Sequence, residues 1–162
     1  MNVQNLSHKQ KEQLRSIIPS NSDTLEYFPC CVKLINGDKV DNVYIVNVDI
    51  YLKVWGVMPD EDKGKKYVLI EDVEQILESP NRLPVNIANK LYEEGESGMG
   101  YCLFKIIFDN GETIDIVSGN AIDFVPIPVG LTNKNIKDVL PHVGSRQKHL
   151  NGLDYYWCLY KE

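Results

Sequence analysis

Residues 28–48 have the sequence FPCCVKLINGDKVDNVYIVNV, and this segment sets the expected fold class. An apolar run at 28–35 is followed by Asn36-Gly37, and a second apolar run covers 43–48. Asn-Gly between two apolar runs is a strong hairpin signal, because a type I′ turn needs two residues that tolerate positive φ. The segment therefore predicts two antiparallel strands joined by a tight turn.

The same pattern returns 74 residues later, where an apolar run at 101–108 precedes Asn110-Gly111. We therefore expect two related β-meanders, at 28–56 and 102–130, which would be an internal duplication. Two unrelated hairpins would share the same turn residues, so duplication and chance similarity are both open at this point.

A third strand is expected in each copy. Between Val48 and Trp55, apolar residues alternate with Asp49, Tyr51 and Lys53, which predicts a half-buried strand. The equivalent segment of the second copy is 121–127, which ends among prolines. A short strand is expected at 67–70, and alternating residues predict a last strand over 153–160.

Short helices complete the expected fold. Ser7 and Gln10 have the spacing of a capping box, which predicts an N-terminal helix over 7–18 that Pro19 ends. A turn or two of helix is expected at 72–77, and short helices are expected at 85–92 after Pro84 and at 132–139. The predicted fold class is α+β, with mainly antiparallel β-meanders covered by two or three short helices.

Length and composition fit a single globular domain over 1–162. The chain has 162 residues and a mass of 18.5 kDa, with 43% hydrophobic and 25% charged residues. No stretch approaches the ~20 apolar residues that cross a bilayer, and the polar N-terminus lacks the apolar core of a secretory signal. We therefore expect no membrane partner.

The net charge of −6 makes nucleic acid an unexpected partner, because such binding depends on basic side chains that neutralise phosphates. The acidity is concentrated at 21–80, which has a net charge of −6 and includes Asp60, Glu61 and Asp62. This run is either a solvated face that aids solubility or a surface that meets a basic protein.

The four cysteines indicate reduced thiols in the cytoplasm. Cys30 and Cys31 are adjacent, whereas Cys102 and Cys158 are isolated, so a disulfide scaffold or a metal site is not expected. The three histidines share no ligand motif with acidic residues. We expect neither a metal nor another cofactor.

The segment 95–100, Gly-Glu-Ser-Gly-Met-Gly, has the composition of a phosphate-binding loop. Its context is wrong, because a phosphate loop leads from a strand into a helix, whereas here a helix precedes and a strand follows. Glu93, Glu94 and Glu96 would also repel a phosphate. The segment is therefore expected to be a flexible connection or a loop that contacts a partner.

A nucleophile and base could in principle be assembled from Cys102 and His142, oriented by Asp109 or Asp123. Their spacing does not support this pairing. A cysteine in so apolar a strand is more often an inert core residue. A small ligand-binding or enzymatic site near the glycine loop, Asp123 and His142 is the alternative hypothesis.

Aromatic residues supply possible anchors for a protein partner. Tyr51 and Trp55 lie in the first half, and Tyr155, Tyr156, Trp157 and Tyr160 cluster near the C-terminal end. Rings beside carboxylates are typical of recognition surfaces. The same rings could instead cover the edge of the core.

Three motifs resemble a family of small uncharacterised bacterial proteins. They are the loop Gly-Glu-Ser-Gly-Met-Gly-Tyr at 95–101, the segment Gly-Asn-Ala-Ile-Asp-Phe at 119–124, and Leu-Pro-His-Val-Gly at 140–144. The general profile is also similar to that of immunity proteins of bacterial toxin systems, which are small, acidic and cytoplasmic. The resemblance implies a non-enzymatic protein that binds a toxin.

The leading hypothesis is therefore an immunity protein that occludes the basic active site of a cognate toxin. An enzymatic or ligand-binding domain and a structural adaptor are the alternatives. The expected partner-binding residues are Asp60, Glu61, Asp62, Glu93, Glu94, Glu96, Tyr51, Trp55 and Tyr156.

Overall fold

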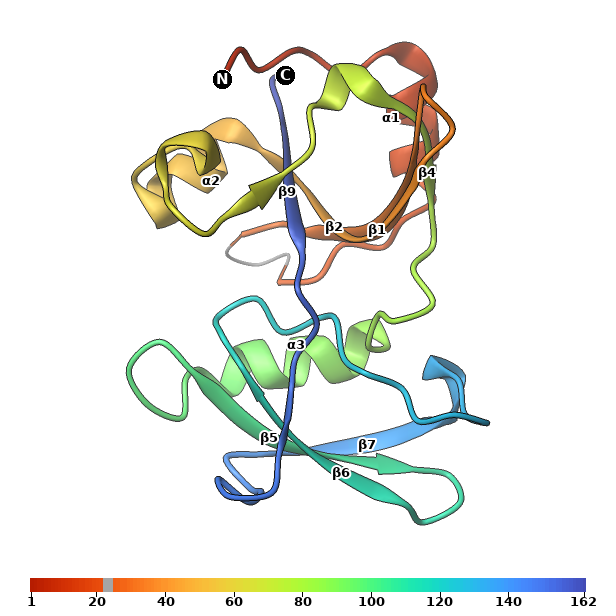
Figure 1. Cartoon of the computed structure of the whole chain (residues 1–162), viewed down its shortest axis with the longest axis vertical. Coiled ribbons are helices and arrows are strands. Elements are labelled where there is room, and N and C mark those ends of the chain that lie inside the picture. The colour runs from red at the N-terminus through yellow and green to blue at the C-terminus, as the bar shows by residue number, and fades with distance from the viewer. Residues whose placement is uncertain (22–24) are drawn as a thin grey trace. The chain divides into compact units, whose positions relative to one another are not determined.

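The computed structural model describes residues 1–21 and 25–162, which form two compact units. Unit 1 consists of 1–79 and 155–162, and unit 2 consists of 80–154. Figure 1 shows the elements of each unit. Whether the chain unfolds as the single domain expected from its length stays a prediction.

Each unit combines one sheet with covering helices. The elements of unit 1 are α1 (His8–Leu14), β1 (Phe28–Leu34), β2 (Lys39–Asn47), α2 (Val48–Trp55), β3 (Lys66–Tyr67), β4 (Val73–Leu77) and β9 (Tyr156–Tyr160), with 3-10 helices η1 (Pro59–Glu61) and η2 (Ile70–Asp72). The elements of unit 2 are α3 (Val85–Glu94), β5 (Cys102–Phe108), β6 (Thr113–Ser118), β7 (Ile136–Pro141) and β8 (Leu150–Asn151), with the 3-10 helix η3 (Asn133–Asn135).

Both sheets are mixed. The strand order is β3-β9-β2-β1-β4 in unit 1 and β7-β5-β6-β8 in unit 2. In unit 1, β1 pairs antiparallel with β2 and with β4, and β9 pairs parallel with β2. In unit 2, β5 pairs antiparallel with β6 and with β7, and β8 pairs parallel with β6. The α+β prediction with short covering helices is confirmed.

Both predicted hairpins are present, but the type I′ turn is wrong. Gly37 donates to Leu34 O and Leu34 donates to Asp38 O, which closes a three-residue loop. Gly37 has a φ of 94°, whereas Asn36 does not take a positive φ. This is a type I turn followed by a left-handed glycine, which also matches the twist of the strands. Asn36 instead accepts from the Asp38 amide at 2.9 Å.

The second hairpin repeats these bonds 74 residues later. Gly111 donates to Phe108 O, Phe108 donates to Glu112 O, and Asn110 Oδ1 accepts from the Glu112 amide. The strand registers correspond as well, since Val32 pairs with Val40 and the equivalent pair is Ile106–Ile114. The hairpins at the start of the two expected repeats are therefore equivalent in structure.

The third strands expected in the repeats are wrong. Residues 48–55 form α2, because Asn47 caps the amides of Asp49 and Ile50 and Gly56 ends the helix with a φ of 74°. The caps outweigh an alternating pattern that fits a strand. Residues 121–125 are buried, but within 121–127 the structure has only one isolated bridge, through Phe124.

The two units also share strands beyond the hairpins, but these strands are not 74 residues apart in the sequence. After each hairpin, a 3-10 helix leads into an edge strand, β4 or β7. Ile35 donates to Asp72 O at the end of η2, and Asp109 donates to Asn135 O at the end of η3. The parallel strands β9 and β8 lie on the other side of the hairpins. Common ancestry of the two units stays a prediction.

The helices expected at 72–77 and 132–139 are wrong, because both segments contain edge strands. Val73 and Ile76 are buried although they are three residues apart, a spacing typical of a helix. A β-bulge between β1 and β4 produces this spacing, and a bulge at the same place between β5 and β7 does so in unit 2. A strand with a bulge can therefore have buried residues at the three-residue spacing that is typical of a helix.

The N-terminal helix begins as predicted and ends early. The Ser7 hydroxyl accepts from the Gln10 amide at 3.1 Å and the Gln10 side chain accepts from the Ser7 amide at 2.9 Å, which completes the capping box. The helix ends at Leu14 rather than near residue 18. Buried Gln10 also donates to the carbonyls of Ile70 and Val73, so α1 is fixed beside β4.

Candidate functional site

The acidic run of unit 1 lies on η1 and just after it, and its charges meet cations of the same unit. Asp60 Oδ2 lies 2.6 Å from the Met1 ammonium, which lowers the pKa of Asp60 and raises that of the amino group. Asp62 lies 3.3 Å from Lys65, and Glu61 is exposed. Two of the three expected partner-binding acids of unit 1 therefore already have intramolecular counter-ions.

The expected anchors Tyr51 and Trp55 belong to an aromatic cluster around Trp157. Tyr51 is fully buried, and burial raises the pKa of its hydroxyl. Trp55 is half-buried, with Lys65 Nζ 3.6 Å from its ring centre and 3.2 Å from the Tyr51 hydroxyl. Tyr51 therefore offers no surface to a partner, and a cation of the same unit occupies the Trp55 ring face. The cluster also contains Tyr27, Tyr44 and Tyr155.

Tyr156, the remaining aromatic candidate, is half-buried on β9. Lys66 Nζ lies 5.8 Å from the centre of its ring. Its partly open position is compatible with a contact at the rim of an interface, whereas an interface anchor is usually buried deeply by the partner.

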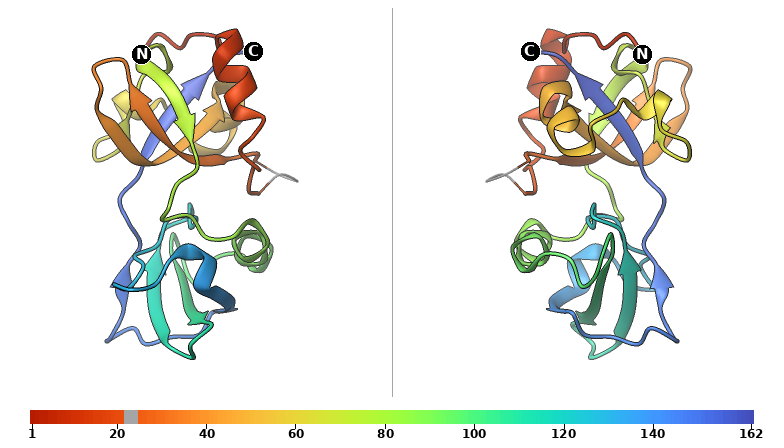
Figure 2. Two further views of the ribbon diagram at one scale, coloured as in Figure 1. Left: turned by 90° about the vertical axis from the view of Figure 1, so that its right-hand side faces the viewer. Right: turned by 90° about the vertical axis from the view of Figure 1, so that its left-hand side faces the viewer.

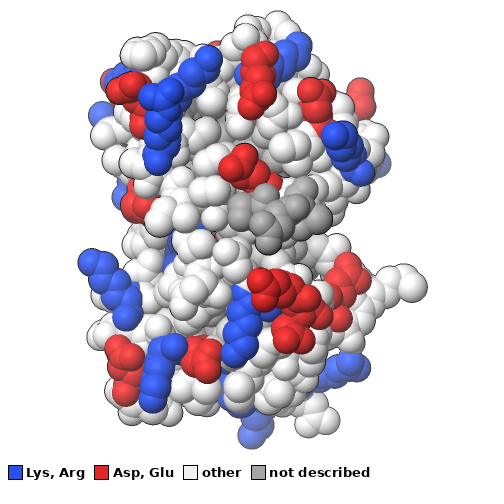
Figure 3. All heavy atoms as spheres, turned by 180° about the vertical axis from the view of Figure 1, so that it is seen from behind, with Lys and Arg blue, Asp and Glu red and all other residues white. Residues whose placement is uncertain are grey.

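Unit 2 presents the other acidic group on an open surface. Helix α3 ends at Glu94, and Gly95 follows with a φ of 72°. Glu93, Glu94 and Glu96 are all exposed, and the Met99 side chain beyond them is 99% exposed. Figure 3 shows acidic side chains gathered on unit 2, in the lower half of that view.

Ser97 and His142 fix this loop to the end of β7. Ser97 Oγ lies 2.7 Å from His142 Nδ1 and also accepts from the Leu103 amide at 2.8 Å. His142 Nε2 lies 3.2 Å from the Glu94 carbonyl oxygen. A carbonyl only accepts, so Nε2 donates to it, and in the neutral imidazole Nδ1 accepts from the Ser97 hydroxyl, which also lies 3.3 Å from the Leu103 carbonyl oxygen. His142 has a φ of 58°, an uncommon conformation for this residue.

A second contact fixes the far end of the loop. The Arg146 guanidinium bonds the Tyr101 hydroxyl and lies 5.4 Å from the centre of its ring. Gly98 packs so close to this ring that an added Cβ would lie 2.3 Å from it. Glu96 accepts from the Gly100 amide at 3.1 Å. These contacts link both ends of the loop to the rest of unit 2, and the two expectations, a flexible connection or a loop that contacts a partner, stay predictions.

The structure does not bring Cys102, His142 and Asp123 together as the nucleophile, base and orienting acid of the catalytic hypothesis. Cys102 is buried, and burial raises the pKa of its thiol, which disfavours the nucleophilic thiolate. Asp123 is fully buried and accepts from the Tyr92 hydroxyl, whereas His142 is exposed. The residue that meets His142 is Ser97, which no spacing in the sequence singled out.

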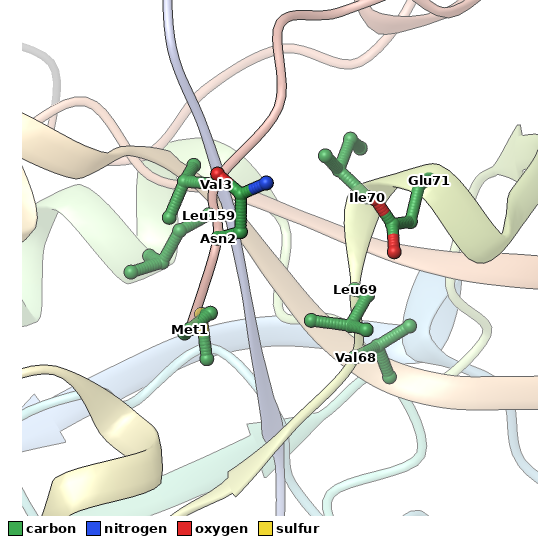
Figure 4. Close-up of a pocket in the computed structure, with 8 residues that line it drawn as sticks. All are labelled: Met1, Asn2, Val3, Val68, Leu69, Ile70, Glu71 and Leu159. Atoms are coloured by element: carbon green, nitrogen blue, oxygen red, sulfur yellow. The ribbon is translucent and has the colours of Figure 1, made fainter.

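The remaining features of the described residues limit other chemistry. The four cysteines are buried thiols, and no three His, Cys, Asp or Glu side chains among residues 1–21 and 25–162 gather as a metal site requires. The crevice of Figure 4, between the N-terminal segment and residues 68–71, has no space for a water-sized molecule. No helix within the described ranges is long and apolar enough to cross a bilayer.

Comparison of the chain with protein-family models, with curated proteins and with solved structures finds no significant match. The site is therefore interpreted from its own geometry and chemistry.

Proposed function

We propose that this chain binds a basic protein through the acidic loop surface of unit 2, which consists of Glu93, Glu94, Glu96 and Met99. The observation that carries the proposal is the fully exposed Met99 beside three exposed carboxylates. Methionine adapts its shape to an apolar contact, and carboxylates steer a basic partner towards it. The surface thus combines an apolar anchor with a charged rim.

The contacts that hold the loop favour the same use. A loop that is already ordered loses less conformational entropy on binding than a mobile one. Ser97 with His142, and Tyr101 with Arg146, supply that order from two different ends of the loop. The acidic side chains can therefore meet a partner in a preset arrangement.

The particular partner that we propose is a toxin whose active site is a basic cleft. Acidic residues that cover such a cleft would exclude its substrate, which is how an immunity protein neutralises a toxin by occlusion. Asp60, Glu61 and Asp62 are the second candidate surface, which the neutralised charges of Asp60 and Asp62 make less favourable.

The two acidic groups provide a matched test. The triple variants E93K/E94K/E96K and D60K/E61K/D62K change the net charge equally, so general electrostatic effects cancel between them. Tagged protein would be used to capture partners from native lysate, followed by mass spectrometry and reconstitution with the purified partner. We expect a stoichiometric, basic, salt-sensitive partner that only the unit 2 variant loses.

Two further results would bear on the proposal. If the partner is a toxin, co-expression of the wild-type chain restores growth of cells that produce it, and E93K/E94K/E96K does not. Loss of binding with D60K/E61K/D62K alone would instead assign the surface to unit 1. Capture of no basic partner from a lysate that contains the products of the neighbouring genes would contradict the proposal.

A second candidate function is acyl transfer, which the Ser97–His142 distance of 2.7 Å favours. Ser97 Oγ would bond an acyl carbon while its proton passes to His142 Nδ1, and the leaving group would then take this proton. Water would later release the acyl group from Ser97. The test is covalent labelling by a fluorophosphonate, with a mass increase in the wild type that His142→Gln abolishes. Unlabelled Ser97 would leave the pair with a purely structural role.

A further inference from the structure

A groove in unit 1 lies between α1 and the end of β9. It has a volume of about 450 Å³, within the range of roughly 300–1,000 Å³ that is typical of small-molecule sites. Figure 2 shows α1 beside this end of β9, and the bridge between Asn5 and Lys161 joins the two segments. The acidic loop surface belongs to the other unit, so the groove has no part in the proposed function.

The floor of the groove is apolar. Leu14, Ile17 and Tyr160 are buried, and Leu6 and Phe28 are half-buried at its sides. These side chains come from the N-terminal segment, β1 and β9, so the tertiary fold alone brings them together. An apolar floor of this kind favours a ligand with a hydrocarbon body.

The rim of the groove is basic although the chain as a whole is acidic. Lys11, Arg15 and Lys161 line it, against the side-chain and main-chain carboxylates of Glu162. Arg15 also lies 3.3 Å from Glu12, which is not among the lining residues. The lining groups therefore carry three positive charges and two negative charges, in a chain with a net charge of −6.

We propose that this groove binds a small amphipathic organic anion, with a hydrocarbon body on the floor and a single carboxylate at the basic rim. Charge complementarity selects an anion over an amine, and the apolar floor selects a hydrocarbon chain over a sugar or nucleotide. Burial, with the charges of Glu162 and Glu26, raises the pKa of the Tyr160 hydroxyl. The lysines attract the carboxylate, since charge-assisted hydrogen bonds are the strong ones.

The test uses three ten-carbon probes that differ only in their head group: decanoate, decylamine and decanol. Each would be titrated below its micellar concentration into the full chain, with binding followed by calorimetry and by amide chemical shifts. We expect saturable 1:1 binding of decanoate, with shifts centred on α1 and the end of β9. Decanol and decylamine should bind at least about tenfold more weakly, which corresponds to 1.4 kcal/mol.

Matched variants separate the rim from general charge effects. K11Q/K161Q removes two exposed rim cations, and K9Q/K148Q removes two exposed lysines that do not line the groove. These exposed positions should leave folding intact. Decanoate affinity should fall about tenfold in the first variant only. No saturable decanoate binding, equal binding of decanol, or equal effects of the two variants would overturn the proposal.

Discussion

Ile76 and Val139 hold equivalent places in the two units, where each lies on an edge strand and has a backbone group bound by a helix side chain. Gln13 of α1 accepts from the Ile76 amide at 3.1 Å, and Lys90 of α3 donates to the Val139 carbonyl at 2.9 Å. An exposed edge strand is a template for another strand. Side chains of α1 and α3 therefore take hydrogen-bonding positions on the edge strands β4 and β7, in addition to covering the cores.

We predict that Gln13→Ala lowers the free energy of unfolding by about 1 kcal/mol, because the Ile76 amide loses its acceptor. Hydrogen exchange of this amide should accelerate, which NMR can follow directly. Gln147→Ala, at an exposed position of unit 2, is the control and should change stability by less than about 0.5 kcal/mol. Unchanged exchange at Ile76 would show that water replaces the glutamine without loss.

Ser97→Ala should destabilise the chain by about 1–2 kcal/mol, since it removes the acceptor of the Leu103 amide and the donor to His142. Urea unfolding followed by circular dichroism measures the change. Ser16→Ala is the control, because the Ser16 hydroxyl is exposed and its described hydrogen bond goes to the nearby Gln13 carbonyl. Equal stability of the two variants would argue against a loop held by Ser97.

Asp115→Asn should destabilise the chain at neutral pH by about 1–2 kcal/mol. Lys105 at 2.7 Å, together with the Ser145 amide, lowers the pKa of the Asp115 carboxyl. A lowered folded pKa gives stability that is present above the unfolded pKa and is lost as the pH falls through the folded value. The difference between wild type and variant should therefore shrink below about pH 4. A difference in stability that stays constant below about pH 4 would contradict this prediction.

Lys65 should produce a dependence of the same sign, but at alkaline pH. Burial lowers the pKa of its ammonium despite the attraction of Asp62. Between the folded and unfolded pKa values the unfolded chain binds more protons, so stability rises with pH. The wild type should therefore gain stability relative to Lys65→Met as the pH rises from neutral towards the ordinary lysine pKa of about 10.4. A difference in stability between wild type and Lys65→Met that does not change over this pH range would contradict this prediction.

Both tryptophans belong to unit 1, which allows a test of the single-domain expectation. Trp55 and Trp157 fluorescence reports on unit 1, whereas circular dichroism reports on both units. We predict coincident urea transitions, and a shift of both by Ile106→Ala in the core of unit 2. A fluorescence transition that this substitution leaves unchanged would show that the units unfold independently.

The acidic surfaces and the glycine loop could be identified from the sequence, whereas the contacts that define the site could not. Glu93, Glu94 and Glu96 stand together in the chain, so their shared surface follows from local position. Ser97 and His142 are 45 residues apart and meet only because β5 and β7 pair. The burial of Tyr51 likewise depends on strands from distant parts of the chain.

Local chemistry determined the elements that the sequence predicts well. The two Asn-Gly hairpins, the Ser7 capping box and the helix after Pro84 each depend on residues within a few positions. The helix at 48–55 is also determined locally, by the caps Asn47 and Gly56, although its alternating apolar residues predict a strand. The tertiary structure decided the edge strands β4 and β7. Their apolar spacing fits a helix or a bulged strand, and pairing with a neighbouring strand selects the strand, because which residues become buried depends on the core that forms.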